Sequence, residues 1–156
     1  MNEYTIVPYT PEVLEDVTAI ERAAFSTPWS SESLKHAGEM ENSIFFAVTA
    51  GGKTAGFGCI LLAAGEGELV DIAVSPAYRK QGLGQMLMTA LLTEAEKRGA
   101  CQVFLEVRQS NMPARNLYEK NGFRPIGLRK KYYKNPTEDA VLMCRVLSDA
   151  ASLQTI

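Results

Sequence analysis

Residues 83–99 carry the clearest helical pattern in the chain, and they follow a strand-like segment across a short turn that contains two glycines. The apolar residues at helical spacing, which predict one buried face, are Leu83, Leu87, Leu91 and Ala95. Lys97 and Arg98 in the last turn, with Gly99 beyond them, are typical of a helix end. A long amphipathic helix between strands has to cover a sheet, so we expect an α/β fold.

The other segments alternate between strand and helix periodicities. Strands are expected at residues 3–9, 43–50, 54–64, 65–74, 101–108, 123–133 and 138–147. A second helix is expected at residues 11–25, and its apolar face would contain Val13, Val17, Ile20 and Phe25. A short helix is expected after Ser30, which would be its N-cap, and another at residues 111–123. This order predicts one domain over residues 1–147, with a mixed sheet covered by helices, and a frayed tail at residues 148–156.

The charge balance argues against two classes of partner. The chain has 156 residues and carries 16 basic against 18 acidic side chains, for a net charge of -2. Bulk attraction to nucleic acid or to an anionic membrane has no support, so neither is expected as a partner. No apolar run approaches the roughly 20 residues that span a bilayer, and the N-terminus lacks the basic-then-apolar order of a signal peptide. We expect the protein in the cytoplasm.

The three cysteines, Cys59, Cys101 and Cys144, are odd in number, widely spaced and embedded in apolar strand-like runs. Buried free thiols are the expected state. No CxxC pair exists and the only histidine is His36, so no metal site is expected.

The glycine turn before the long helix has the chemistry of an anion site. A helix N-terminus has unpaired N–H groups and a partial positive charge, and Gly82 and Gly84 remove side-chain bulk in front of it. Arg79 and Lys80 add positive charge at the rim. A bare GxG is more often an ordinary turn, and neither the P-loop pattern nor the dinucleotide-binding GxGxxG pattern matches here.

The strand "VDIAV", the turn "RKQGLG" and the helix together resemble the acetyl-CoA signature of the GNAT superfamily of N-acetyltransferases. The resemblance implies that the pantetheine arm lies along Ile72, Ala73 and Val74. It also implies that the coenzyme A pyrophosphate is bound by Arg79, Lys80, Gln81, Gly82, Leu83, Gly84 and Gln85. A pantetheine arm has amides that can extend a sheet edge much as a peptide strand would.

The segment "SNMPARNLYEKNGF" resembles the second signature of the same superfamily, in which an Asn opens a helix and Leu-Tyr precede a Gly-Phe turn. The matching residues are Asn111, Ala114, Leu117, Tyr118, Gly122 and Phe123. Asn111 and Tyr118 are thereby assigned to the acetyl-CoA site. Core packing is the expected role of Leu117 and Phe123, and a half-buried aromatic with a paired hydroxyl is the alternative for Tyr118.

Across nearly the whole chain the resemblance is closest to the bacterial ribosomal-protein-alanine N-acetyltransferases. "TPWS", "DIAVSPAYRKQGLG", "LEVRQSN", "LYEKNGF" and "RKKYY...EDAVLM" stand in that group's order. The residues between Trp29 and Ser43 and the tail after Leu147 depart from it. The resemblance implies the GNAT fold, with a mixed, mostly antiparallel sheet, an acetyl-CoA donor, and the N-terminus of a protein as acceptor, a ribosomal protein being favoured.

The resemblance also assigns the catalytic roles. Glu106, a carboxylate among apolar neighbours on a strand, is implied as general base, and Tyr118 as the general acid that protonates the departing thiolate. A pairing of Glu106 with Arg108 or with a lysine is the structural alternative. Trp29, Tyr132 and Tyr133 are weaker candidates for acceptor binding. Tyr132 and Tyr133 are expected on opposite faces of their strand.

Direct attack of the amine in a ternary complex is expected, because no histidine stands near a cysteine to activate it. Two alternatives stay open. The acceptor could be a lysine or a small-molecule amine, or the chain could bind acyl-CoA as a sensor without catalysis. The sequence gives no indication of the oligomeric state.

Overall fold

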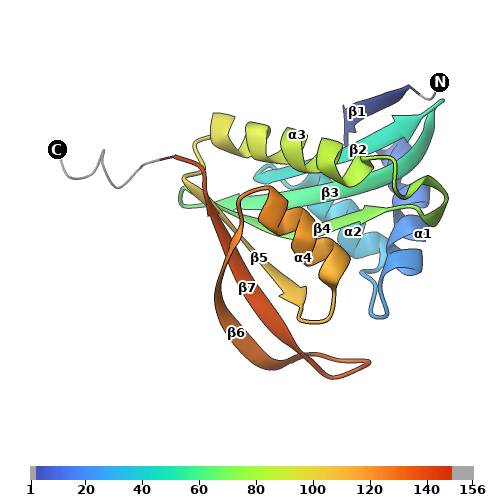
Figure 1. Cartoon of the computed structure of the whole chain (residues 1–156). Helices are drawn as coiled ribbons and strands as arrows, with labels where there is room; N and C mark the ends of the chain where they lie inside the picture. Colours follow the sequence, from blue (N-terminus) through green and yellow to red (C-terminus); the bar gives the residue numbers. More distant parts are fainter. Residues whose placement is uncertain (1–2, 149–156) are drawn as a thin grey trace.

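The computed structural model describes residues 3–148, which form one seven-stranded sheet with helices on both faces (Figure 1). The strands are β1 Tyr4–Pro8, β2 Ser43–Ala50, β3 Lys53–Ala63, β4 Glu66–Val74, β5 Gln102–Arg108, β6 Arg124–Tyr133 and β7 Glu138–Val146. The helices are η1 Pro11–Val13, α1 Leu14–Ala24, α2 Ser31–Glu39, η2 Pro76–Tyr78, α3 Leu83–Lys97 and α4 Met112–Lys120. Of the expected tail at residues 148–156, all but Ser148 lies outside the described residues.

The sheet is mixed and mostly antiparallel, as expected. Its strand order is β1-β2-β3-β4-β5-β7-β6. Only β4 and β5 run parallel, because α3 carries the chain across one face of the sheet between them. The other neighbouring strands pair antiparallel.

The helices cover the two faces in pairs. In Figure 1, α3 and α4 lie on one face, and α1 and α2 lie on the other. The predicted apolar face of α3 is confirmed, since the four residues that were expected to share it are all buried, namely Leu83, Leu87, Leu91 and Ala95. Burial of these side chains against the sheet fixes α3, and therefore the turn that precedes it.

The predicted helix over residues 11–25 is divided into η1 and α1, and its C-terminal boundary was wrong by one residue. Val17 and Ile20 are buried against the sheet as expected. Phe25 is the C-cap of α1 with φ -129° and ψ 144°, and it is 38% exposed. Because the backbone is extended at Phe25, its side chain does not lie on the helix face that its sequence spacing predicted.

The expected short helix after Ser30 is confirmed as α2. The Ser30 hydroxyl oxygen accepts a hydrogen bond from the Ser33 N–H at 3.1 Å, so Ser30 is its N-cap. The α1–α2 loop is therefore fixed at both ends, by the end of α1 and by this cap.

The three cysteines are free thiols in the described part of the chain. Cys59 is buried, as expected, whereas Cys101 and Cys144 are only half-buried, because they lie at or near the outer ends of β5 and β7. Over residues 3–148, no helix is long and apolar enough to cross a membrane.

Candidate active site

Strands β4 and β5 pair with each other over only part of their length. The parallel register runs from Glu66 opposite Gln102 to Leu69 opposite Leu105, and then stops. Beyond this point β4 stays paired with β3, and β5 stays paired with β7 (Figure 1). The inner edges of the two strands therefore diverge and present backbone groups that no neighbouring strand bonds.

A β-bulge in β4 lies where the divergence begins. The register with β3 shifts between Cys59, opposite Asp71, and Ile60, opposite Leu69, so Val70 is the extra residue. After the bulge, the odd-numbered residues bond to β3, as the Ser75 N–H to Ala55 carbonyl bond of 2.7 Å shows. By alternation, the N–H and C=O of Ile72 and Val74 turn toward the β5 side.

The three residues expected along the pantetheine arm are Ile72, Ala73 and Val74, and they form this diverging half of β4. The Asp71 carboxyl hydrogen-bonds to the backbone N–H of Ile72. The N–H of Val74 lies farther along the same edge. The strand thus offers a sheet edge to a ligand with amide groups.

The turn from β4 to α3 has the geometry of an anion site. Gly82 is the N-cap of α3, in the left-handed conformation with φ 80° and ψ 12°. A Cβ at Gly82 would meet no atom within 4 Å, so glycine is required for the backbone conformation and not for space. No side chain caps α3, and its first turn has no acidic residue. The first N–H groups of α3 therefore remain available to an anion.

The other residues expected at the pyrophosphate lie around this turn. Arg79, Lys80 and Gln81 are exposed, and Lys80 takes a positive φ of 63°. The Tyr4 hydroxyl from β1 donates a hydrogen bond to Gln81 Oε1, which ties the turn to the first strand. Leu83 is 1% exposed and anchors the start of α3 in the core, so only its backbone faces the turn.

Gly84 and Gln85 also join α3 to α4, a role that the sequence reasoning did not anticipate. A Cβ at Gly84 would lie 3.3 Å from the Leu117 side chain, so this glycine permits close packing of the two helices. The Gln85 side-chain amide exchanges two hydrogen bonds of 2.9 Å with the buried Asn121 amide. The turn and the helix of the second signature are therefore one packed unit.

Helix α4 positions Asn111 and Tyr118. Asn111 is the N-cap, and its side-chain oxygen accepts a hydrogen bond of 3.3 Å from the Ala114 N–H. Tyr118 is 8% exposed and packs edge-on against Phe123, with ring centroids 5.9 Å apart. Burial raises the pKa of Tyr118, and the charges of Asp71 and Tyr133 raise it further. Its hydroxyl therefore stays protonated at neutral pH.

Glu106 lies on β5 just beyond the last residue paired with β4. Its neighbours Leu105 and Val107 point into the core, so Glu106 projects from the opposite face of the sheet. Its Oε1 lies 3.7 Å from Arg129 Nε, on β6, and the Arg129 side chain is 56% exposed. Its Oε2 is buried and has no hydrogen-bond donor among the described residues. The ion-pair partner is thus Arg129, not the Arg108 considered from sequence.

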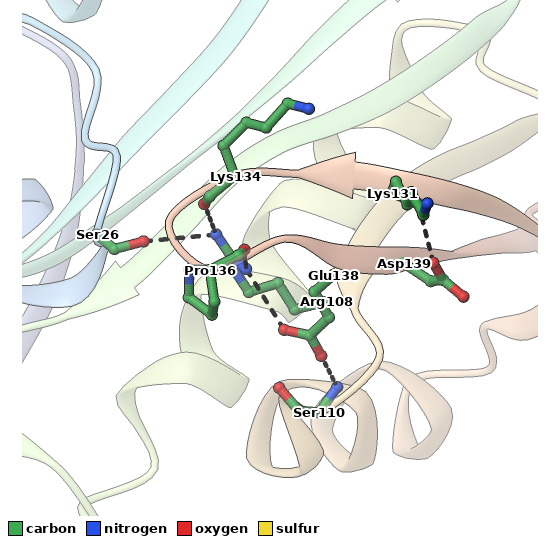
Figure 2. A network of polar contacts seen from close by, with 8 residues as sticks. All are labelled: Ser26, Arg108, Ser110, Lys131, Lys134, Pro136, Glu138 and Asp139. Carbon is green, nitrogen blue, oxygen red and sulfur yellow. Dashed lines mark hydrogen bonds and ion pairs between the residues drawn. The ribbon is translucent and has the colours of Figure 1, made fainter.

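Arg108 instead joins three segments at the end of β5, in a cluster that we call the Arg108 clamp (Figure 2). Its guanidinium donates to the carbonyls of Lys134 at 2.6 Å and Pro136 at 2.9 Å, in the β6–β7 turn. It also contacts Glu138 Oε1 and Ser26 Oγ, each at 3.4 Å. The clamp holds the β6–β7 turn against the α1–α2 loop, on the same sheet face as Glu106.

Glu138 and Tyr133 complete the Arg108 clamp. The Glu138 carboxylate also accepts a 2.5 Å hydrogen bond from the Ser110 N–H, and its bonds to Ser110 and Arg108 lower its pKa. The Arg108 guanidinium carbon lies 4.6 Å from the centre of the Tyr133 ring. No sequence motif pointed to Arg108 as a structural joint, because its partners come from turns more than 25 residues away.

Tyr132 and Tyr133 do not lie on opposite faces of β6, so that expectation was wrong. Their rings contact each other edge-to-face, with centroids 5.1 Å apart. The register of β6 with β7 shifts between Arg129 and Tyr133, and Lys131 has a positive φ of 53°, which breaks the alternation. Both rings therefore lie beside Glu106. A hydrogen bond to the Glu106 carboxyl group is the main cause that raises the pKa of Tyr132. Burial is the main cause that raises the pKa of Tyr133 to about 12, and the charge of Glu106 raises it further.

Trp29, a weaker candidate for acceptor binding, is half-buried in the α1–α2 loop. Its backbone N–H donates to Glu21 Oε2 at 2.9 Å, and its side chain packs on the core beneath α1 and α2. A surface hollow of about 880 Å³ beside α2 is lined in part by Trp29 and Leu61. This hollow shares only Trp29 with the residues predicted for the site. Glu106 and the three β4 residues predicted for the pantetheine arm lie instead at the β4–β5 divergence, and the glycine turn follows β4.

The comparisons with known proteins show the family of the chain. The profile of the Acetyltransferase (GNAT) family matches residues 14–123, which include both signatures and Glu106. The chain therefore belongs to the GNAT acetyltransferase family, whose donors are acyl-CoA thioesters.

Within that family, the chain is similar to the [Ribosomal protein bS18]-alanine N-acetyltransferase of Escherichia coli (strain K12), with 39% identity over 131 residues, 83% of this chain and 88% of that protein. The enzyme of the same name from Haemophilus ducreyi is 37% identical, over 82% of this chain and 90% of that protein. The crystal structure of the Escherichia coli ribosomal-protein-S18-alanine N-acetyltransferase superposes with a TM-score of 0.87 at 36% identity, covering 94% of this chain and 95% of that chain. Ard1 from Thermoplasma volcanium gives a TM-score of 0.86 at 26% identity, covering 94% and 99%.

Proposed function

We propose that this protein transfers the acetyl group of acetyl-CoA to the α-amine at the N-terminus of a protein, with the N-terminal alanine of ribosomal protein bS18 as the favoured acceptor. The observation that carries the proposal is the divergence of β4 from β5 beside the uncapped N-terminus of α3, with Glu106 projecting from β5 at that point. The similarity to the bS18-alanine enzymes supports the choice of acceptor.

Binding of acetyl-CoA requires a site for its pyrophosphate and a strand edge that hydrogen-bonds to the amides of its pantetheine arm. The first N–H groups of α3 and the Gly82 backbone supply the pyrophosphate site, with Arg79 and Lys80 as nearby positive charges. The edge of β4 that no strand pairs with supplies hydrogen-bonding groups for the arm at the Ile72 carbonyl and at the backbone of Val74. The Val74 N–H is suited to stabilise the thioester oxygen as negative charge develops on it.

The acceptor side needs a base strong enough to receive a proton from an amine. An α-amine has a pKa of about 7.7 and a lysine about 10.4, a difference that corresponds to roughly 3.7 kcal/mol. A single carboxylate such as Glu106 can therefore serve an α-amine much more readily than a lysine. Arg129 Nε lies 3.7 Å from Oε1 of Glu106. The buried Oε2 of Glu106 has no hydrogen-bond donor among the described residues, so Oε2 is the oxygen that we assign to accept the proton.

Tyr118 is the group proposed to assist the leaving thiolate. Its buried hydroxyl stays protonated, because its pKa is raised above the ordinary value of 10.0. It can therefore donate a hydrogen bond to the sulfur as the carbon–sulfur bond breaks. Because the raised pKa makes Tyr118 a weaker acid than a thiol of pKa about 8.5, we assign it stabilisation of the thiolate first and full proton transfer second.

Direct transfer fits the cysteines better than a covalent acetyl-enzyme. Burial is the main reason that the pKa of Cys59 is raised to about 12, and it also raises the pKa of Cys144. Both thiols are therefore protonated at neutral pH and poorly nucleophilic. We expect no stable acetyl group on the protein after exposure to acetyl-CoA alone, as measured by intact mass.

The test uses two peptides that begin with alanine, one with a free α-amine and one blocked at that amine but containing lysine. Each is incubated with the purified protein and acetyl-CoA, and its mass is measured. We expect one added acetyl group on the free peptide alone. Transfer to the blocked peptide would move the assignment to lysine or another amine, and transfer to neither, with acetyl-CoA still bound, would favour a non-catalytic acyl-CoA sensor.

A further inference from the structure

Two carboxyl groups face each other inside the protein, where α1 packs against β4. Glu21, on α1, is 2% exposed, and Asp71, beside the bulge of β4, is 7% exposed. The titratable groups that face them from other elements are Cys59 on β3 and Tyr118 on α4. No basic side chain pairs with either carboxyl group among the described residues. Two buried carboxylates without a counter-charge would repel each other strongly.

The hydrogen bonds of the pair leave one oxygen of each group in need of a proton. Glu21 Oε2 accepts from the Trp29 N–H at 2.9 Å, and the Asp71 carboxyl accepts from the Ile72 N–H. The other two oxygens, Glu21 Oε1 and Asp71 Oδ2, are buried and have no donor in the described residues. The two carboxyl groups are within hydrogen-bonding reach of each other, so one proton between them satisfies both oxygens.

The electrostatics agree with that arrangement. Burial, then the hydrogen bond to Glu21 and its charge, raise the pKa of Asp71 from 3.8 to about 9. Cys59 and Tyr118 are neutral when the pair ionises, because the pKa of Cys59 is about 12 and that of Tyr118 is raised from 10.0. Neither can supply a compensating positive charge.

We propose that Glu21 and Asp71 share one proton at neutral pH, and that the protonated pair is a positioning element that holds the Trp29 segment of the α1–α2 loop against strand β4. The pair bonds two backbone N–H groups, one in the loop and one in the strand edge proposed for the donor. The same loop meets the β6–β7 turn through the contact of Ser26 with Arg108. Loss of the shared proton would place two negative charges together and push the loop away from β4.

The consequence for acceptor binding rests on the function proposed above, whereas the shared proton does not. The α1–α2 loop lies on the same sheet face as Glu106, whereas the glycine turn lies at the N-terminus of α3. We therefore expect loss of the proton to raise the KM for the acceptor peptide and to leave the affinity for acetyl-CoA nearly unchanged.

The first experiment needs no activity. Trp29 is the only tryptophan in the sequence, so its fluorescence reports on the loop. We expect an infrared carbonyl band of a protonated carboxyl group at pH 7, and a change of Trp29 emission with a midpoint near pH 9, where the pKa of Asp71 lies. Asp71→Asn keeps a hydrogen-bond donor to Glu21 without a titrating proton, and should remove both signals.

The matched control is Glu41→Gln, which neutralises an exposed carboxylate between α2 and β2 and should leave both signals as in the wild type. Absence of the carbonyl band from the wild type at pH 7 would overturn the shared proton. An emission change near pH 9 that persists in Asp71→Asn would overturn the link between the pair and the loop.

The second experiment measures steady-state kinetics from pH 7.5 to 9.5 with an alanine-initiated peptide. In the wild type, the acceptor KM should rise several-fold across this range, while the Kd for acetyl-CoA changes less than about twofold. Asp71→Asn should abolish the rise in KM. The ionisation of the peptide amine is the same with both proteins, so it does not contribute to the difference between them. An equal rise in both proteins would overturn the positioning role. If no peptide is acetylated, the proposed function fails, and the spectroscopic experiment still decides on the shared proton.

Discussion

Glu106 combines two properties at one carboxyl group, an exposed arginine partner at one oxygen and an unpaired, buried second oxygen. Replacing Glu106 with Gln keeps the shape and removes the base. We expect turnover to fall on the order of 10²- to 10⁴-fold, the range for a lost general base. The Kd for acetyl-CoA, measured by calorimetry, should change less than about twofold, because the proposed donor site lies on β4 and α3.

Glu119→Gln is the matched control for that change, since Glu119 is an exposed carboxylate on α4. Its turnover should equal that of the wild type. Unchanged turnover in Glu106→Gln would remove Glu106 from the mechanism and leave it the role of an ion-pair partner of Arg129.

Tyr118 tests whether a buried hydroxyl contributes to catalysis or only to packing. Phe at this position keeps the edge-on contact with Phe123 and removes the hydroxyl. The hydroxyl makes no hydrogen bond to another described residue, so we expect the free energy of unfolding to change by less than about 1 kcal/mol. Turnover should fall roughly 10²-fold. Full turnover with unchanged stability would assign Tyr118 to the core alone.

At the scale of the elements, the glycine turn and α4 form one packed unit. Substitution of Gly82 and of Gly84 by alanine should affect donor binding and turnover differently. Gly82→Ala forces a side chain into a left-handed conformation at a cost of about 1 kcal/mol. The added methyl group meets no atom within 4 Å, so its effect comes from the backbone alone. We expect the turn to be distorted and acetyl-CoA binding to be weaker. Gly84→Ala instead presses on Leu117 at 3.3 Å and should shift α4, lowering turnover through Tyr118.

Calorimetry for the donor and steady-state turnover separate these two outcomes. The prediction for Gly82 requires the larger increase in the acetyl-CoA Kd, and that for Gly84 the larger loss of turnover at saturating donor. Equal effects of the two substitutions on the acetyl-CoA Kd and on turnover would contradict separate roles for Gly82 in donor binding and for Gly84 in the position of α4.

The Arg108 clamp gives a second prediction at this scale. Arg108→Lys keeps the charge but cannot reach the turn carbonyls and Ser26 together, because a lysine lacks the planar fork. Losing one charge-assisted hydrogen bond costs about 1.5–3 kcal/mol. We expect the acceptor KM to rise roughly tenfold or more, with an unchanged Kd for acetyl-CoA. Lys130→Gln, an exposed change on the same hairpin, is the control and should leave both constants as in the wild type.

Local patterns in the sequence were sufficient to predict most elements, and pairings between distant segments were not. The period of Leu83, Leu87 and Leu91 predicted α3 because each helix face depends on residues three or four apart. The same alternation rule failed for Tyr132 and Tyr133, because a register shift against β7 turns both rings to one side. Register depends on which strand becomes the neighbour, and a single segment does not encode that.

In the candidate site, too, local motifs could be predicted from the sequence and contacts between distant segments could not. The glycine turn and the α4 signature are continuous in sequence and were found there. Asp71 stands in an apolar strand as "LVDIAV", a signal that could have marked a buried acid, but its partner Glu21 is 50 residues away. The ion-pair partner of Glu106 and the contacts of Arg108 likewise come from the fold.

At the scale of the whole molecule, the sheet consists of two halves, β1 to β4 and β5 to β7, that share only a short parallel register. Few backbone bonds join the halves beside the site, so side-chain contacts have to fix the loops around it. The Arg108 clamp ties the β5–β7 half to the α1–α2 loop, and the Glu21–Asp71 pair ties that loop to β4.

That second tie should make the stability of the entire domain depend on pH. The folded protein raises the pKa of Asp71 from 3.8 to about 9, so between these values it holds a proton that the unfolded chain releases. The contribution to stability is complete below about pH 3.8 and is lost as pH rises through about 9. The free energy of unfolding should therefore fall with rising pH in this window, by on the order of 1 kcal/mol per pH unit.

Urea unfolding of the wild type and of Asp71→Asn at pH 6, 7, 8 and 9 measures this slope. The Asn variant has no proton to lose at this position, so its free energy of unfolding should vary less, and its advantage over the wild type should grow by about 1 kcal/mol at each step. The ionisable groups outside the Glu21–Asp71 pair are identical in both proteins and cancel in the difference. A constant difference across the four pH values would mean that Asp71 is already ionised at pH 6, and that α1 tolerates two buried charges against β4.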